Sequence, residues 1–248
     1  MILNIAAYHF VHIDDPQALA TRLQQHAAAC GLLGTMLIAQ EGINLFLAGN
    51  ETSVREFLDV LRSDARFAAI RIKQSHGHMQ PFAQLKVKIK PEIISFRRDG
   101  ASPLDGRAPA VAPKTLARWI EQGHDDAGRR LVLLDTRNRE EVDHGTFVGA
   151  LTLPIDNFTD LPEALAPHRD DLRDATVVSF CTGGIRCEKA ALWLRNDGMD
   201  NALQLDGGIL GYFEEVGGVG YEGRCFVFDA RVALDAQLMP LMDAMPAS

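Results

Sequence analysis

The feature that constrains this chain most is a stretch in its second half, where a buried-strand pattern meets a cysteine, two glycines and a helix-forming segment. Residues 177–180 are mostly apolar, as in a short buried strand. Residues 188–194 are strong helix formers with an apolar face. Between them lie Cys181 and a tight turn that comprises Thr182, Gly183, Gly184, Ile185 and Arg186. The pattern predicts that Cys181 lies at the junction of a strand and the N-terminus of a helix.

An ionised sulfur is favoured at such a junction. Backbone N–H groups of the turn and the positive end of the helix dipole stabilise an anion there. Arg186 adds a positive charge, which either stabilises the sulfur anion or binds an anionic group. These effects lower the pKa of a thiol, so we expect Cys181 to be a nucleophile. The alternative is a small cysteine that only fills space, but that role gives no reason for two glycines and an arginine in the same turn.

From residue 131 onward, predicted strands and helices alternate, which is typical of an α/β domain with a mostly parallel sheet. Strands are expected at 131–134, 148–153, 177–180 and 203–205, and helices at 114–122, 158–168 and 209–215. Ligands bind outside the carboxyl ends of the strands in such sheets. Asp135, Cys181 and Asp206 all fall at these ends, so we expect residues 114–232 to form one domain that carries the site.

The first 98 residues have a different order of predicted elements, strand-helix-strand-strand-helix-strand. Strands are expected at 2–11, 34–39, 43–48 and 70–74, with helices starting at Asp14 or Asp15 before Pro16 and at Thr52 or Ser53. This order predicts a ferredoxin-like (acylphosphatase-like) α+β domain. Residues 99–113, rich in glycine, proline and alanine, are expected to be a linker, and residues 233–248 a C-terminal tail.

Charge is distributed unevenly along the chain. The net charge of −8 argues at first against an RNA partner. Residues 66–98, however, contain eight lysines or arginines and only one acidic residue, Glu92. Residues 84–90 alternate as a strand, so Lys86, Lys88 and Lys90 share one face. Such lysines either protect an edge strand from unwanted pairing or contact phosphates, and the spacing alone leaves both interpretations open.

Two sets of motifs in the second half of the chain resemble those of rhodanese domains. One is Cys-x-x-Gly-x-Arg at 181–186, and the other covers segments 131–141 and 145–154. A closer resemblance rests on five blocks at 135–138, 145–147, 180–189, 204–210 and 224–232. These blocks resemble the rhodanese-containing tRNA uridine(34) hydroxylases, and the resemblance covers nearly the whole chain.

Enzymes of that family convert the wobble uridine, position 34 of certain tRNAs, to 5-hydroxyuridine with oxygen. The resemblance implies tRNA as the partner, molecular oxygen as the co-substrate and Cys181 as the catalytic residue. It also favours RNA contact for the basic strand, and the candidates are Lys86, Lys88, Lys90 and Arg97. We expect no metal site, and the sequence identifies no other cofactor, because it contains no flavin or haem motif.

Four further residues are expected to support the cysteine. Asp135 and Arg137 are expected mainly as an ion pair that fixes the loop, with direct substrate contact as the alternative. Cys187 either resolves an oxidised Cys181 by forming a disulfide or is simply buried in the first helical turn. Asp206 precedes two glycines that allow a close approach of two backbones.

Sulfur transfer is the alternative function. Cys181 would take sulfane sulfur from a small donor such as thiosulfate as a cysteine persulfide, and pass it to a thiol or cyanide. A binding module with a vestigial rhodanese domain is a third hypothesis, and the intact Cys181 and Arg186 argue against it. Longer family members carry a cysteine-rich tail, whereas no cysteine follows Cys225 here, so the resemblance is to a short form.

The composition is that of a globular protein, with 47% hydrophobic and 23% charged residues among 248. No apolar run approaches the roughly 20 residues that span a bilayer. The four cysteines lack the spacing of a disulfide framework. We therefore expect a protein of the reducing cytoplasm with no membrane partner.

Overall fold

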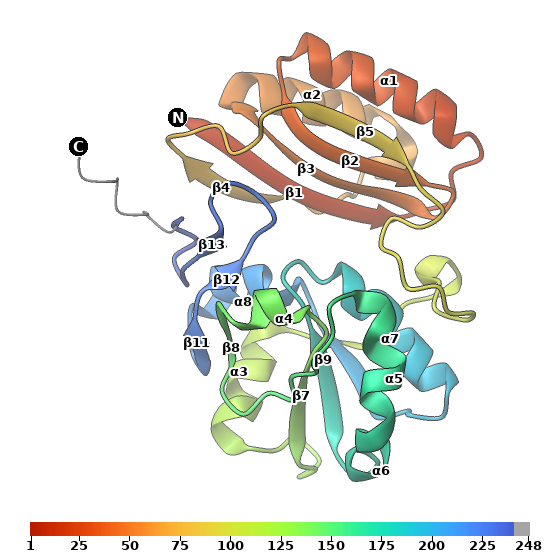
Figure 1. The fold of residues 1–248 in the computed structure, drawn as a ribbon, viewed down its shortest axis with the longest axis vertical. Coiled ribbons are helices and arrows are strands. Elements are labelled where there is room, and N and C mark those ends of the chain that lie inside the picture. Colours follow the sequence, from red (N-terminus) through yellow and green to blue (C-terminus); the bar gives the residue numbers. More distant parts are fainter. Residues whose placement is uncertain (241–248) are drawn as a thin grey trace. The chain divides into compact units, whose positions relative to one another are not determined.

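The computed structural model describes residues 1–240, without the side chain of Asp105, so the last eight residues of the predicted tail lie outside the description. The chain divides into two compact units, Met1–Ser95 (unit 1) and a second that begins at Phe96 (unit 2) (Figure 1). The predicted linker, 99–113, falls within unit 2.

Unit 1 is a five-stranded sheet with two helices on one face (Figure 1). Its elements are β1 (Ile2–Phe10), α1 (Pro16–Ala29), β2 (Leu33–Ala39), β3 (Gly42–Asn50), α2 (Glu51–Ser63), β4 (Lys73–Gly77) and β5 (Leu85–Ile89). The strand order is β4-β1-β3-β2-β5, antiparallel except for the parallel pair of β2 and β5. The first six elements confirm the ferredoxin-like fold, and β5 extends the sheet by one strand.

Local signals explain where the two helices begin. The Asp15 carboxylate accepts a hydrogen bond from the Ala18 N–H, and Pro16 opens α1, as predicted. Asn50 caps α2 by accepting from the Ser53 N–H, so this helix starts at Glu51 rather than at Thr52 or Ser53. Both caps satisfy N–H groups that a helix end leaves without partners.

The fourth strand predicted for this unit begins three residues further along the chain than expected. We expected it at 70–74, but β4 spans Lys73–Gly77. Ile70 is buried in the core at the end of a short 3₁₀ turn, Ala65–Phe67, and its N–H donates to the Phe67 carbonyl. The apolar side chain at 70 therefore closes the turn rather than opening the strand.

Unit 2 is built on a four-stranded parallel sheet in the order β6-β10-β9-β7. Its strands are β6 (Ala110–Val111), β7 (Leu131–Asp135), β8 (Gly145–Phe147), β9 (Thr176–Phe180), β10 (Ala202–Leu205), β11 (Tyr221–Gly223), β12 (Cys225–Phe226) and β13 (Ala233–Leu234). Its helices are α3 (Pro113–Gln122), α4 (Arg139–Val142), α5 (Leu161–Leu165), α6 (Arg169–Leu172), α7 (Ile185–Asn196) and α8 (Gly208–Val216). The sheet confirms the predicted α/β class.

Two predicted elements of unit 2 are wrong in their extent. The strand expected at 148–153 reduces to a single bridge between Leu151 and Leu134, because the adjacent β8 pairs instead with β11. The helix expected at 158–168 is broken into 3₁₀ turns and α5, with prolines at the first turns of successive pieces. The predicted linker contains β6, which pairs with β10 at the sheet edge.

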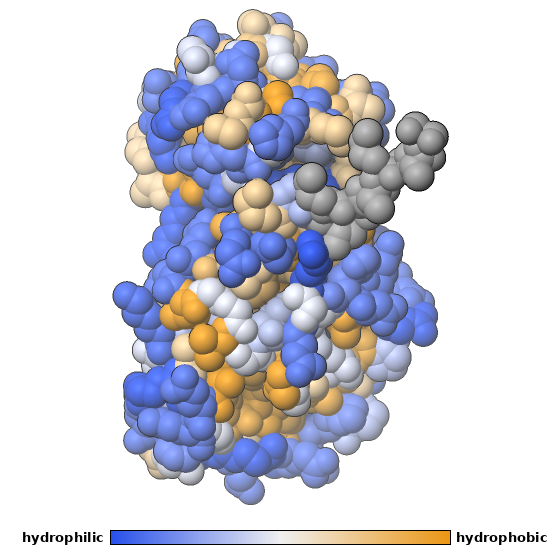
Figure 2. Space-filling model, turned by 90° about the vertical axis from the view of Figure 1, so that its left-hand side faces the viewer, coloured by the Kyte–Doolittle hydropathy of each residue, from blue (hydrophilic) through white to orange (hydrophobic). Residues whose placement is uncertain are grey.

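Within residues 1–240, none of the helices is long and apolar enough to cross a membrane. Figure 2 views the molecule from the side on which β8 and β11 lie in Figure 1 and shows hydrophobic side chains gathered on unit 2. The exposed hydrophobic residues of this unit include Val148 (59% exposed) and Val219 (41%).

Candidate active site

Cys181 directly follows β9, an inner strand of the parallel sheet, as the sequence predicts. The turn ends at Gly184, whose backbone is left-handed (φ 100°), and α7 begins at Ile185. The Gly184 N–H donates a hydrogen bond to the Cys181 sulfur at 3.2 Å. Cys181 is fully buried, so its sulfur is surrounded by the turn and the first residues of the helix.

The surroundings of Cys181 favour the thiolate. Burial alone would raise the pKa of this thiol, because it penalises the charged form. A hydrogen bond from Cys187, the charge of Arg186, and the N–H groups of Arg186 and Gly184 outweigh burial and lower the pKa to about 5. A sulfur with this pKa is ionised at neutral pH, as a nucleophile requires.

The pKa of Cys187, the thiol beside Cys181, shifts in the opposite direction. This residue lies in the first turn of α7, is fully buried, and burial together with the neighbouring Cys181 raises its pKa well above the ordinary value. Cys187 therefore keeps its proton and donates it in a hydrogen bond to the Cys181 thiolate. The Thr136 hydroxyl lies 3.8 Å from the Cys187 sulfur.

Arg186 is held by a residue that the sequence analysis missed, Glu141 of α4. Two guanidinium nitrogens donate to the two carboxylate oxygens at 2.6 and 2.7 Å, and both side chains are buried. Burial would raise the pKa of Glu141, but the charge and hydrogen bonds of Arg186 lower it. Glu141 also accepts from the Thr182 hydroxyl at 3.3 Å, which connects α4 to the cysteine turn.

A sequence signal marks Glu141, although not its partner. Asn138 and Glu141 form a capping box, in which the glutamate accepts from the Asn138 N–H at 3.1 Å. The spacing of these two residues predicts a helix start. The ion pair with Arg186 joins residues 45 positions apart, and no local sequence pattern predicts such a contact.

Asp135 and Arg137 form an ion pair in which both side chains are fully buried. The guanidinium donates to both carboxylate oxygens, at 2.9 and 2.7 Å, and to the Gly145 carbonyl at 2.7 Å. The Thr146 hydroxyl donates to Asp135 at 2.7 Å. The pair therefore joins the end of β7 to β8, which fits the expected role in fixing loop geometry.

The β10–α8 turn packs against the cysteine turn and is hydrogen-bonded to it. The N–H groups of Ile209 and Leu210 donate to the carbonyls of Cys181 and Thr182 at 2.9 and 3.0 Å. A Cβ at Gly208 would lie 2.5 Å from the Cys181 carbonyl oxygen, and its φ of +62° also favours glycine. Asp206 precedes these glycines, and its carboxylate lies 3.9 Å from Arg107.

The predicted RNA contacts fall in both units. Lys86 and Lys88 lie on β5, at the edge of the unit 1 sheet, and their side chains are exposed. Lys90 continues this ladder, because its N–H donates to the Ile38 carbonyl at 2.9 Å. Arg97 is exposed too, but it belongs to unit 2.

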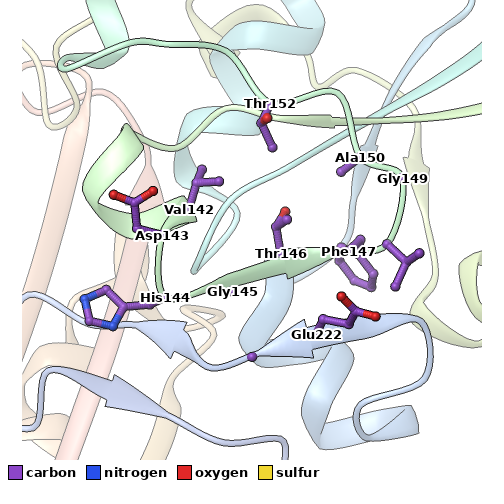
Figure 3. Close-up of a pocket in the computed structure, with 12 residues that line it drawn as sticks. Val142, Asp143, His144, Gly145, Thr146, Phe147, Gly149, Ala150, Thr152 and Glu222 are labelled. Carbon is purple, nitrogen blue, oxygen red and sulfur yellow. The ribbon is translucent and has the colours of Figure 1, made fainter.

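Two other features of the described residues lie apart from the cysteine turn. A surface hollow of about 490 Å³ is lined by the β8 segment, with Asp143 and His144 at one end and Glu222 at the other (Figure 3). Cys181 does not line it. In unit 1, ligand atoms of His26, Cys30 and Glu56 lie within 4.8 Å of one another, a grouping that the sequence analysis did not predict.

Known proteins resemble this chain along nearly its whole length. Residues 2–93 match the model of the UPF0176 acylphosphatase like domain, and residues 112–215 match the rhodanese-like domain. A protein of Xanthomonas campestris named tRNA uridine(34) hydroxylase is 68% identical over 98% of this chain and 96% of its own length. The chain belongs to the tRNA uridine(34) hydroxylase family.

Other members of this family are similarly close. The hydroxylase of Xanthomonas euvesicatoria is 68% identical over 98% of both chains, and that of Xylella fastidiosa is 63% identical over 98% of this chain and 95% of its own. Among solved structures, the rhodanese-like domain of an Anabaena protein is 21% identical, with a TM-score of 0.37, over 46% of this chain and 79% of that one. The family resemblance expected from the cysteine block is confirmed.

Proposed function

We propose that this chain hydroxylates uridine 34 of tRNA at C5, with molecular oxygen as co-substrate and Cys181 as the catalytic residue. The carrying observation is the buried Cys181 sulfur, which accepts a hydrogen bond from the Gly184 N–H in the turn before α7, in a chain 68% identical to a curated tRNA uridine(34) hydroxylase. The names of the relatives support hydroxylation over sulfur transfer. A thiolate at a helix N-terminus supports nucleophilic chemistry.

The two cysteines offer a source of electrons for this reaction. Hydroxylation places one oxygen atom on C5 and reduces the other to water, which consumes two electrons and two protons. When the Cys181 thiolate and the Cys187 thiol close to a disulfide, they supply two electrons and one proton, and the solvent supplies the second proton. Uridine, oxygen, one thiolate, one thiol and one proton thus give 5-hydroxyuridine, water and one disulfide. The two sulfurs are already joined by a hydrogen bond. An external thiol reopens the disulfide by exchange.

The charged residues around the cysteine turn hold this turn in position. Arg186 stabilises the Cys181 thiolate, and Glu141 fixes the guanidinium in place. Asp135 and Arg137 hold β7 and β8 together at the carboxyl end of the sheet, and Asp206 begins the turn that supports the cysteine turn. These residues act through Cys181 rather than on the substrate.

Basic residues bind the tRNA in this proposal. The exposed ammonium groups of Lys86, Lys88 and Lys90 contact phosphates along β5, and Arg97 supplies a further contact. The overall charge of −8 repels RNA, so a local basic segment is required for binding.

The experiment uses cells that lack their own uridine-34 hydroxylase, express this chain and grow under heavy-isotope oxygen. Mass spectrometry of tRNA nucleosides should find 5-hydroxyuridine that carries one heavy oxygen atom, and Cys181→Ser should abolish it. Unlabelled 5-hydroxyuridine would contradict molecular oxygen as the source. Absence of the nucleoside, together with thiosulfate-dependent sulfur transfer that Cys181→Ser abolishes, would replace the proposal by the sulfurtransferase function.

A second variant tests the thiol pair. With purified, fully reduced chain and tRNA but no added thiol, the wild type should make about one 5-hydroxyuridine per chain and Cys187→Ala should make none. A small thiol should give the wild type multiple turnovers and should give Cys187→Ala part of that activity. Cys181→Ala should stay inactive under both conditions. Full activity of Cys187→Ala without added thiol would contradict the role of Cys187 as electron donor.

A further inference from the structure

The sheet of unit 1 has one face that its helices do not cover (Figure 1). Because side chains alternate along strands, the register decides which residues share this face. One row across all five strands consists of Lys73, Ala6, Phe46, Thr35 and Lys86. The next row consists of Tyr8, Asn44, Leu37 and Lys88. We call this surface the open face of the sheet.

Aromatic rings stand on the two central strands of the open face. Phe46 of β3 is 37% exposed. Tyr8 and Phe10 of β1 are half-buried, and their ring centroids lie 5.9 Å apart in an edge contact. Flat rings on adjacent central strands of a sheet form a platform on which unpaired bases stack. Burial of a core does not explain Phe46, because the apolar core of unit 1 lies on the helix side of the sheet.

The charges of the open face complement a phosphate backbone. None of the five strands contains an aspartate or glutamate. Lys86 and Lys88 border the face along β5, and Lys73 lies on the opposite edge strand, β4. The Lys73 ammonium is buried, so the accessible charge lies along β5. An acidic chain that keeps carboxylates out of this sheet and exposes two lysines at this edge offers a local site for a polyanion.

The polar side chains between the rings are engaged with backbone groups. The Asn44 amide donates to the Ile93 carbonyl at 3.2 Å, and the Asn4 amide donates to the Ser75 carbonyl at 3.3 Å. Both asparagines are buried. These donors are directed at the protein, so stacking and charge, rather than reading of base edges by these amides, provide the interaction.

We propose that the open face binds the single-stranded part of the tRNA, with bases stacked on Tyr8, Phe10 and Phe46 and phosphates on Lys86 and Lys88. The inference deepens the proposed function, because uridine 34 lies in an unpaired loop. It assigns to unit 1 the capture of the loop that carries the substrate, and it leaves the chemistry to the cysteine turn.

Binding of a fluorescently labelled anticodon stem-loop to the full chain tests the proposal. The variant Tyr8→Leu/Phe46→Leu keeps apolar volume but removes two rings, and it should weaken binding at least ~10-fold. The variant Lys86→Gln/Lys88→Gln should lower the slope of log affinity against log salt by about 1.4, whereas the aromatic variant should leave that slope unchanged. Lys114→Gln, an exposed lysine of unit 2, is the matched control.

Several outcomes would overturn the inference. Wild-type affinity in Tyr8→Leu/Phe46→Leu contradicts it. Unchanged affinity with a lowered unfolding temperature would mean that the face packs against protein instead. Should the double variant fail to fold, Phe46→Leu alone provides the test, because this ring is partly exposed.

Measurement of 5-hydroxyuridine on the same proteins separates this inference from the proposed function. A chain that hydroxylates tRNA and is insensitive to the aromatic changes refutes the platform only. A chain that binds the stem-loop through these rings but makes no 5-hydroxyuridine refutes the hydroxylase only.

Discussion

The two units use charged side chains in opposite ways. Around the cysteine turn, Asp135, Arg137, Glu141 and Arg186 are buried and paired, with each carboxylate bound by two guanidinium nitrogens. Along β5, Lys86 and Lys88 are exposed at the edge of a sheet. Charges of the first kind cannot reorient and hold geometry, whereas charges of the second kind are available to a partner.

This difference indicates which charged residues hold the geometry of the site and which are available to the substrate. A buried pair costs desolvation and stabilises only when its geometry is complete, so removal of one partner leaves a costly isolated charge. An exposed lysine contributes little to folding, and its effect appears when a polyanion binds. The two groups should therefore respond oppositely in measurements of unfolding and of RNA affinity.

Removal of a buried carboxylate should have the largest effect on stability. Asp135→Ala leaves the Arg137 guanidinium buried without its partner and should lower the free energy of unfolding by ~3–5 kcal/mol. Urea denaturation measures this change. The matched control is Asp156→Ala, which breaks the exposed Arg139–Asp156 pair and should cost less than ~1 kcal/mol. Equal losses in the two variants would contradict the comparison.

The variant Gly208→Ala tests the geometry of the cysteine turn separately from the overall stability of the chain. Gly208→Ala drives a Cβ against the Cys181 carbonyl and the Gly184 N–H, at 2.5 and 2.6 Å, so the cysteine turn must shift. We expect at least ~10-fold lower hydroxylation, with a loss of stability of about 1–3 kcal/mol. Gly128→Ala has a similar positive φ but open space around the Cβ, and it should retain activity. Full activity of Gly208→Ala would show that the support of the turn is dispensable.

The Cys181 pKa should depend on Arg186. Replacing both members of the ion pair, in Arg186→Met/Glu141→Gln, avoids an isolated buried charge and removes the cation that favours the thiolate. The thiolate absorbance of the wild type should appear as pH rises through about 5, and in the variant it should appear at higher pH. Subtracting the absorbance of Cys181→Ala isolates the signal of this sulfur. An unchanged midpoint in Arg186→Met/Glu141→Gln would assign the low pKa to the helix terminus and Cys187.

The exposed lysines should have the smallest effect on folding. The triple variant Lys86→Gln/Lys88→Gln/Lys90→Gln should change the free energy of unfolding by less than ~0.5 kcal/mol per site. Its affinity for tRNA should fall, and the salt slope should decrease by about 2 to 3. Filter binding at several salt concentrations measures both quantities. Unchanged affinity would leave β5 as an ordinary solvated edge strand.

Local patterns in the sequence predicted most of the features that depend on residues close together in the chain. The position of Cys181 between β9 and α7, the Asp15 cap with Pro16 and the alternation of β5 all depend on neighbours within a few residues. Contacts between distant segments were beyond such patterns. The Glu141–Arg186 pair, the pairing of β8 with β11 and the parallel addition of β5 to β2 arise from tertiary packing.

The most direct test compares tRNA nucleosides from a strain that lacks this activity and carries the wild-type chain, Cys181→Ala or Cys30→Ala. Cys30 lies in unit 1, so its variant controls for the loss of a cysteine elsewhere in the chain. Mass spectrometry should find 5-hydroxyuridine with the wild type and with Cys30→Ala, and none with Cys181→Ala at equal protein levels. Normal 5-hydroxyuridine with Cys181→Ala, or none with the wild type, would contradict a hydroxylase that works through the Cys181 thiolate.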